Sequence, residues 1–181
     1  MKKFAAVACV LGMAGAVLAA DLESGLPVGE SVPAFNVRDV TGPNKGKTLC
    51  YRCQYGSRPV VAVFTRTIND DVVELVKKVD EKVAENKDAK MAAFVILLTE
   101  DADSDEAKLE KIAAEKKIAN TPLTIIEGSS GPENYKISKD AEVTVMMWVE
   151  SEVKVNAAFE KGKFDKKAAE KLVAETKKIL E

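Results

Sequence analysis

The sequence predicts a three-layer α/β fold, in which a mixed central β-sheet carries helices on both faces. Two observations lead to this class. Uninterrupted apolar runs, typical of strands buried on both faces, alternate with amphipathic helical segments between residues 60 and 126. Two further strands and a closing helix follow. Alternation followed by a hairpin and a helix indicates parallel strands extended by antiparallel ones, with helices packed against the sheet.

The elements of this predicted core follow one another in order. Residues 60–64 form an apolar run that is expected to be a buried strand. Asn69 or Asp70 can cap the next helix, whose apolar residues recur at three- and four-residue steps to about residue 86. The remaining expected elements are a strand at 92–98, a helix at 104–118, strands at 123–126, 143–149 and 152–159, a helical turn at 133–137, and a final helix capped by Asp165.

Residues 21–58 are expected to form a loop-rich extension ahead of a core at 59–181. Eight glycine and proline residues punctuate this extension, and such punctuation is typical of turns and irregular backbone. Two short strands are expected within it, near 34–39 and 47–49. The sequence therefore predicts that the N-terminal part contributes little regular structure.

Residues 1–20 are typical of a secretory signal peptide. Two lysines precede an apolar stretch at 4–20, and small residues then lead to the acidic Asp21. The apolar stretch is shorter than the roughly 20 residues needed to span a bilayer. We therefore expect cleavage after Ala19 or Ala20, and export to the bacterial periplasm or the extracellular space.

The composition of the mature chain excludes several classes of function. Loss of two of the 27 basic residues with the leader leaves 25 against 29 acidic ones, a net charge of −4, and both signs are mixed along the chain. This pattern disfavours nucleic-acid binding. No later apolar run is long enough to cross a membrane. The chain contains no histidine, which excludes histidine-based acid–base catalysis, a Cys-His nucleophile and c-type haem attachment.

Two cysteines remain in the mature chain, Cys50 and Cys53, because Cys9 falls within the leader. Cα atoms three residues apart in a strand lie about 10 Å from each other, whereas a disulfide requires about 4.4–6.8 Å. The pair is therefore expected on a turn or on the first turn of a helix. Arg52 places a cation beside both sulfurs, which favours the reactive thiolate.

The sequence around this pair leaves three interpretations of its role open. Tyr51 and Tyr55 flank the pair and can shield one sulfur or provide a docking surface. One reading is thiol–disulfide exchange with another protein or with a small thiol. A second is a permanent disulfide that pins a glycine-rich loop, and a third is capture of a soft metal such as Cu(I). Two cysteines without histidine do not make a closed zinc site, so neither a resident metal nor a cofactor is expected.

Three stretches of the chain, taken in order, resemble one family. Residues 29–35, leading to Asp39 and Gly42, are similar to the opening of redoxins. Residues 58–64 are similar to the strand that carries the redoxin active site at its end, and residues 135–181 are similar to the closing hairpin and helix of thioredoxin. The chain thus resembles the thioredoxin-like fold in its redoxin branch, which comprises peroxiredoxins and TlpA-like proteins.

The resemblance implies that the site is displaced. In this family the catalytic cysteine follows the central strand, but residues 64–71 contain no cysteine, so peroxidase activity of the usual kind is not expected. The resemblance places Cys50 and Cys53 near the opposite end of that strand. By analogy with the N-terminal cysteine of thioredoxin motifs, Cys50 is the predicted attacking thiol, and another thiol or disulfide protein is the implied partner. The alternative is a non-catalytic binding or scaffolding module in which the disulfide is structural.

Thr65 and Arg66 form a secondary candidate site. They end the central strand, at the position where redoxins carry out their chemistry. Arg66 can bind an anion or pair with Asp70, and the ordinary surface ion pair is the favoured interpretation.

Overall fold

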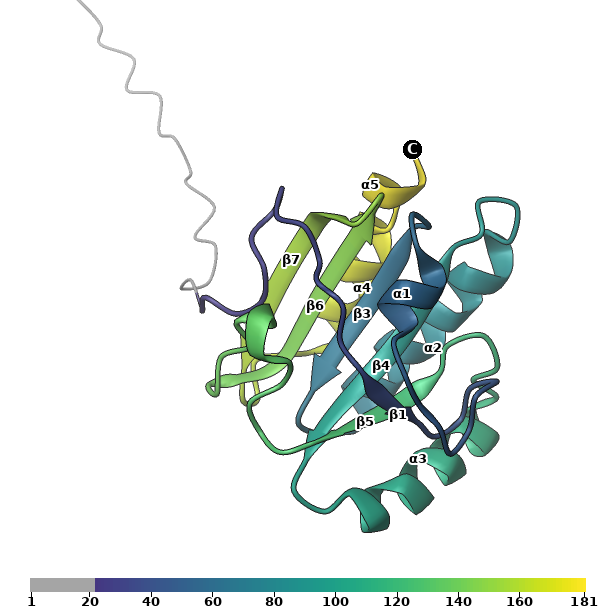
Figure 1. Ribbon diagram of the computed structural model, residues 1–181, viewed down its shortest axis with the longest axis vertical. Coiled ribbons are helices and arrows are strands. Elements are labelled where there is room, and N and C mark those ends of the chain that lie inside the picture. Colours follow the sequence, from purple (N-terminus) through teal and green to yellow (C-terminus); the bar gives the residue numbers. More distant parts are fainter. Residues whose placement is uncertain (1–21) are drawn as a thin grey trace, which may run out of the picture.

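A seven-stranded mixed sheet organises the described part of the chain, residues 22–181, in the computed structural model (Figure 1). The strands are β1 (Val37–Asp39), β2 (Thr48–Leu49), β3 (Val60–Thr65), β4 (Ala92–Thr99), β5 (Leu123–Glu127), β6 (Ala141–Val149) and β7 (Glu152–Glu160). The helices are α1 (Tyr51–Tyr55), α2 (Asp70–Glu85), α3 (Ala102–Lys116), α4 (Lys166–Glu175) and α5 (Lys177–Leu180), with a 3₁₀ turn η1 (Glu133–Tyr135). The expected leader, residues 1–20 with Cys9, lies outside the described residues.

The strand order across the sheet is β2-β1-β5-β4-β3-β6-β7. Strands β3, β4 and β5 are parallel because helices α2 and α3 connect them, and β6 lies antiparallel to β3. Strands β6 and β7 form the expected hairpin, and β1 lies antiparallel to β5. The predicted α/β class with a mixed sheet is confirmed, and the two short strands of the N-terminal extension belong to the same sheet as the core.

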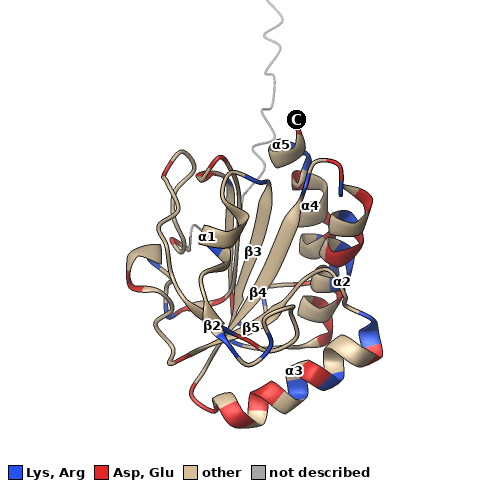
Figure 2. Cartoon of the chain, turned by 45° about the vertical axis from the view of Figure 1, so that its right-hand side comes forward, with Lys and Arg blue, Asp and Glu red and all other residues tan. Residues whose placement is uncertain are grey.

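The two faces of the sheet are covered in different ways. Helices α2, α3 and α4 pack on one face and helix α1 packs on the other (Figure 2). Turn η1 and residues 22–36 pack on the same face as α1. Successive residues of β3 alternate between the two cores: Val61 and Val63 contact the long helices, whereas Ala62 and Phe64 face the side of α1. No helix within the described residues is long and apolar enough to cross a bilayer.

The N-terminal strand is shorter than expected. Strand β1 begins at Val37, not near residue 34. The carbonyl groups just before it, at Val32 and Pro33, accept hydrogen bonds from side chains and not from a neighbouring strand. Those carbonyls are therefore satisfied without extending the sheet.

Two helix boundaries also differ from expectation. Helix α3 begins at Ala102 because the side chain of Asp101 accepts a hydrogen bond from the Ser104 amide and so caps the helix earlier. The final helix is interrupted at Thr176, whose hydroxyl donates to the carbonyl of Val173 at 2.7 Å. These differences leave the arrangement of the sheet unchanged.

Strand β3 sets the distance between the two candidate sites. Helix α1 comes just before its first residue, Val60, whereas Thr65 is its last residue. A six-residue strand is about 17 Å long at the usual rise per residue. The cysteine pair and the Thr65–Arg66 pair therefore lie towards opposite ends of the central strand.

Candidate functional site

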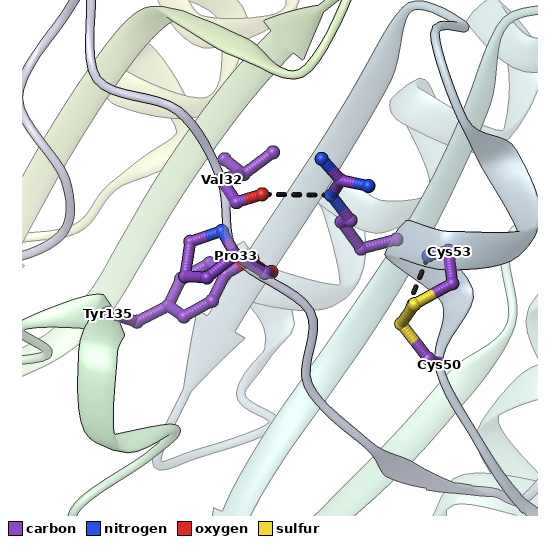
Figure 3. The surroundings of a disulfide bond; sticks show 6 residues. Val32, Pro33, Cys50, Cys53 and Tyr135 are labelled. Atoms are coloured by element: carbon purple, nitrogen blue, oxygen red, sulfur yellow. Dashed lines mark hydrogen bonds between the residues drawn. A yellow bond between two sulfur atoms is a disulfide. The ribbon is translucent and has the colours of Figure 1, made fainter.

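The two cysteines form a disulfide at the start of helix α1 (Figure 3). Their Cα atoms are 5.2 Å apart, which a three-residue spacing permits only where the backbone turns. Cys50 is the N-cap of α1, and its Sγ accepts a hydrogen bond from the backbone N–H of Cys53 at 3.0 Å. The prediction that the pair sits on a turn or on the first turn of a helix is confirmed, and the structure shows the helix.

A buried carboxylate binds the first turn of α1 through a hydrogen bond from Tyr51. Asp39, at the end of β1, is fully buried, and its side chain accepts hydrogen bonds from the Tyr51 hydroxyl at 2.7 Å and from the amides of Gly42 and Asn44 at 2.8 Å each. Three donors satisfy this buried charge, which would otherwise be strongly unfavourable. Burial, and then the hydrogen bond to Asp39, raise the pKa of Tyr51, so the hydroxyl stays protonated and continues to donate.

Gly42 allows this contact to form. A Cβ at this position would lie 2.7 Å from both carboxylate oxygens of Asp39 and would also collide with the Tyr51 hydroxyl. The Asp39 and Gly42 of the redoxin-like opening therefore have a physical role: one supplies the acceptor and the other leaves room for the donor. The motif was visible in the sequence, but its connection to the cysteine helix was not.

Aromatic rings hold the rest of α1 against the sheet. The rings of Tyr51 and Tyr55 are stacked with centroids 5.2 Å apart, and both pack on Phe94 of β4. The Tyr55 hydroxyl donates to the carbonyl of Ala93 over a long 3.4 Å, and burial raises the pKa of Tyr55. Tyr51 is only 1% exposed, so its ring is not available to a docking partner. A modulating effect of either tyrosine on the sulfurs stays a prediction.

Arg52 binds the N-terminal segment. Its Nε donates to the carbonyl of Val32 at 2.8 Å, as the dashed line in Figure 3 shows. The neighbouring carbonyl of Pro33 accepts a 2.6 Å hydrogen bond from the hydroxyl of Tyr135, on the other side of the segment. Arg52 therefore connects the disulfide helix to residues 22–36, and its expected effect on the sulfurs stays a prediction.

The sulfur-bearing residues differ in their access to solvent. Cys53 is exposed, whereas Cys50 is half-buried. An external thiol can reach a disulfide only through an accessible sulfur, so the arrangement permits exchange at the surface.

Among residues 22–181, no group of three or more histidine, cysteine, aspartate or glutamate side chains could hold a metal ion.

Thr65 and Arg66 lie apart from this cluster, at the exit end of β3. The Thr65 hydroxyl donates to the Thr67 carbonyl at 2.6 Å. Arg66 donates to three backbone carbonyls of the segment that precedes and enters β6: Ala141 at 2.9 Å, Ser138 at 2.8 Å, and Ser129. Burial lowers the pKa of this guanidinium. The described residues show no ion pair between Arg66 and Asp70; Arg66 binds backbone instead.

Solved structures similar to this chain share the arrangement of its sheet and helices. A proposed protein disulfide isomerase from Bacteroides thetaiotaomicron matches 88% of this chain and 94% of its own, with 15% identity and a TM-score of 0.63. The reduced 2-Cys peroxiredoxin of Plasmodium vivax matches 83% and 80%, with 13% identity and a TM-score of 0.61. A proposed thiol:disulfide interchange protein, DsbE, from Chlorobium tepidum matches 83% and 98%, with 15% identity and a TM-score of 0.55.

No family model and no curated protein matches the sequence. The structural matches, at identities of this order, show the fold: the chain has a thioredoxin-like fold. The fold expected from the sequence is therefore confirmed. Within that fold, the chain carries a Cys-x-x-Cys disulfide ahead of the central strand.

Proposed function

We infer that this protein is an exported thiol–disulfide exchange protein that acts through Cys50 and Cys53. The observation that carries this inference is the exposure of Cys53 within the disulfide. The exposure of this residue supports approach by a thiolate of another protein from solvent. The similarity to a proposed disulfide isomerase and to a proposed interchange protein supports the same chemistry.

The contacts of helix α1 also support exchange. Tyr51 and Arg52 connect this helix to Asp39 and Val32 through hydrogen bonds that do not involve the sulfurs. A disulfide that closes a loop of about four residues contributes only about 2 kcal/mol by the chain-entropy estimate. Opening the bond therefore leaves α1 attached to the sheet, as a protein that cycles between oxidised and reduced forms requires.

A second candidate function is a non-catalytic binding or scaffolding module. Two observations favour it. The cysteines are displaced from the end of β3, and the two residues at that end, Thr65 and Arg66, donate their hydrogen bonds to backbone carbonyls. In this case the disulfide is a structural clip. The two candidates differ in the reduction potential that they require.

The test combines the reduction potential with an insulin-reduction assay. Exchange predicts a potential within the range of known catalysts, about −120 to −270 mV, and activity that is lost when Cys50 is replaced by Ser. A potential below about −300 mV without insulin reduction would identify the clip. The substitution Thr65→Val is the matched control, because exchange through the cysteine pair does not use the end of β3.

Export is part of the same proposal. The lysines and apolar stretch of residues 1–20 support it, and a disulfide is consistent with an oxidising compartment. We expect the mature protein to begin at Ala20 or Asp21. Mass spectrometry of the protein recovered from the periplasmic fraction and the medium tests this, and an uncleaved chain confined to the cytosol would contradict it.

A further inference from the structure

The two sulfurs of the disulfide are chemically unequal. The Sγ of Cys50 accepts a hydrogen bond from the backbone N–H of Cys53 at 3.0 Å and belongs to a half-buried residue. Cys53 is exposed, and within residues 22–181 no hydrogen bond to its Sγ is found. One sulfur therefore belongs to an exposed residue and has no donor among the described residues, whereas the other belongs to a half-buried residue and accepts one hydrogen bond.

This asymmetry determines which sulfur leaves during exchange. Attack on a disulfide places the negative charge on the sulfur that departs, and a leaving thiol with a lower pKa departs faster. A hydrogen bond to a thiolate stabilises the charged form. The N–H of Cys53 is positioned to stabilise a thiolate on Cys50. Both access and charge stabilisation therefore favour attack on Cys53 with Cys50 as the leaving group.

We propose that Cys53 is the sulfur that exchanges with the incoming thiol and that Cys50 is the leaving sulfur. This order is the reverse of the one expected by analogy with thioredoxin motifs, and it rests on the proposed exchange function. The substrate class is a dithiol, such as a pair of cysteines on another protein, that reacts at an exposed position on helix α1.

The steps balance without an additional oxidant or reductant. A substrate thiolate attacks the Sγ of Cys53, a new substrate–Cys53 disulfide forms, and the Cys50–Cys53 bond breaks with its electron pair on Cys50. The second thiolate of the substrate then attacks the substrate sulfur of this mixed disulfide. The substrate disulfide forms, and Cys53 is released as a thiolate. Two electrons pass from the substrate dithiol, which becomes a disulfide, to the cysteine pair, which is reduced.

The sequence allows a direct assignment of the reacting sulfur in the unaltered protein. The oxidised protein is mixed with reduced glutathione, quenched after short times with N-ethylmaleimide in acid, and digested with trypsin. Cleavage after Arg52 separates the two cysteines into different peptides. We expect glutathione on the peptide that begins with Cys53 and N-ethylmaleimide on the peptide that contains Cys50. Glutathione on the Cys50 peptide would overturn the proposed order.

Two single-cysteine variants provide a matched comparison. Cys50→Ser and Cys53→Ser lose the same disulfide, so any difference between them reports on the remaining sulfur. We expect the remaining thiol of Cys53→Ser, which is Cys50, to have the lower pKa in the pH dependence of its alkylation, because the backbone N–H of residue 53 stabilises its thiolate. A pKa of the Cys50 thiol equal to or above that of the Cys53 thiol in Cys50→Ser would contradict the assignment. If no adduct forms in the unaltered protein, the exchange function itself fails, and this outcome is distinct from adduct on the wrong cysteine.

Discussion

Replacing Tyr51 with Phe removes one hydroxyl from beneath helix α1 and leaves the ring in place. The lost hydrogen bond is buried, 2.7 Å long and made to the carboxylate of Asp39. Hydrogen bonds to charged groups contribute about 1.5–3 kcal/mol. The carboxylate keeps the amides of Gly42 and Asn44, so it is not left unsatisfied. We therefore expect a loss of about 2 kcal/mol in the free energy of unfolding.

Tyr55→Phe is the matched control for this prediction. It removes the same atom from the same helix, but its hydrogen bond to the Ala93 carbonyl is 3.4 Å long and the residue is half-buried. We expect a loss below about 0.5 kcal/mol, since the net value of a hydrogen bond falls steeply with poor geometry. The difference between the variants isolates the contribution of the carboxylate.

Urea unfolding of the oxidised protein, followed by the fluorescence of Trp148, measures both values. With an m-value of about 2 kcal/mol per molar urea, Tyr51→Phe shifts the midpoint down by about 1 M, and Tyr55→Phe shifts it by less than about 0.3 M. Equal shifts in the two variants, or an unchanged midpoint for Tyr51→Phe, would refute the anchoring role of Asp39. A changed m-value would show that the substitution alters the surface exposed on unfolding or the two-state behaviour.

Three further predictions concern the same region. Burial is the main cause that raises the pKa values of all three tyrosines above their ordinary value of 10.0. Above about pH 10 the unfolded chain therefore loses protons that the folded chain keeps, so the free energy of unfolding is highest below that pH and falls as the pH rises. Urea midpoints measured across the alkaline range test this trend. Gly42→Ala inserts a methyl group against Asp39 and is expected to cost about 2–3 kcal/mol, and an unchanged midpoint would contradict the crowding. Replacing both Cys50 and Cys53 with Ser is expected to cost about 2 kcal/mol, and a loss above about 4 kcal/mol would indicate that the disulfide is the main restraint on α1.

The sequence contained enough information to predict the sheet. Apolar runs such as residues 60–64 are long and continuous, and few alternatives to a buried strand remain for them. The turn at Cys50 and Cys53 also followed from spacing, because a disulfide between residues three apart requires a bent backbone. These features depend on local pattern, which a single sequence displays.

The partners of the site residues could not be predicted in the same way. Arg52 binds the carbonyl of Val32, and every residue offers such a carbonyl, so no side-chain pattern marks this acceptor. Arg66 was expected to form an ordinary ion pair, yet it binds carbonyls more than 60 residues away along the chain. Contacts between a side chain and distant backbone depend on the tertiary fold, and the fold class alone does not specify them.

The hydrogen bonds around helix α1 also bear on the order in which the chain folds. The three donors to Asp39 lie within 12 residues of it along the sequence. By contrast, the hydroxyl of Ser24 forms a hydrogen bond with the hydroxyl of Thr144, 120 residues away. The carbonyl of Ser24 accepts a hydrogen bond from the side-chain amide of Asn156, 132 residues away. Because loop closure costs more entropy as the separation grows, we expect residues 37–55 to assemble early and residues 22–36 to dock last. In this order, Cys50 and Cys53 come together before residues 22–36 dock. Formation of the disulfide therefore does not depend on completion of the fold.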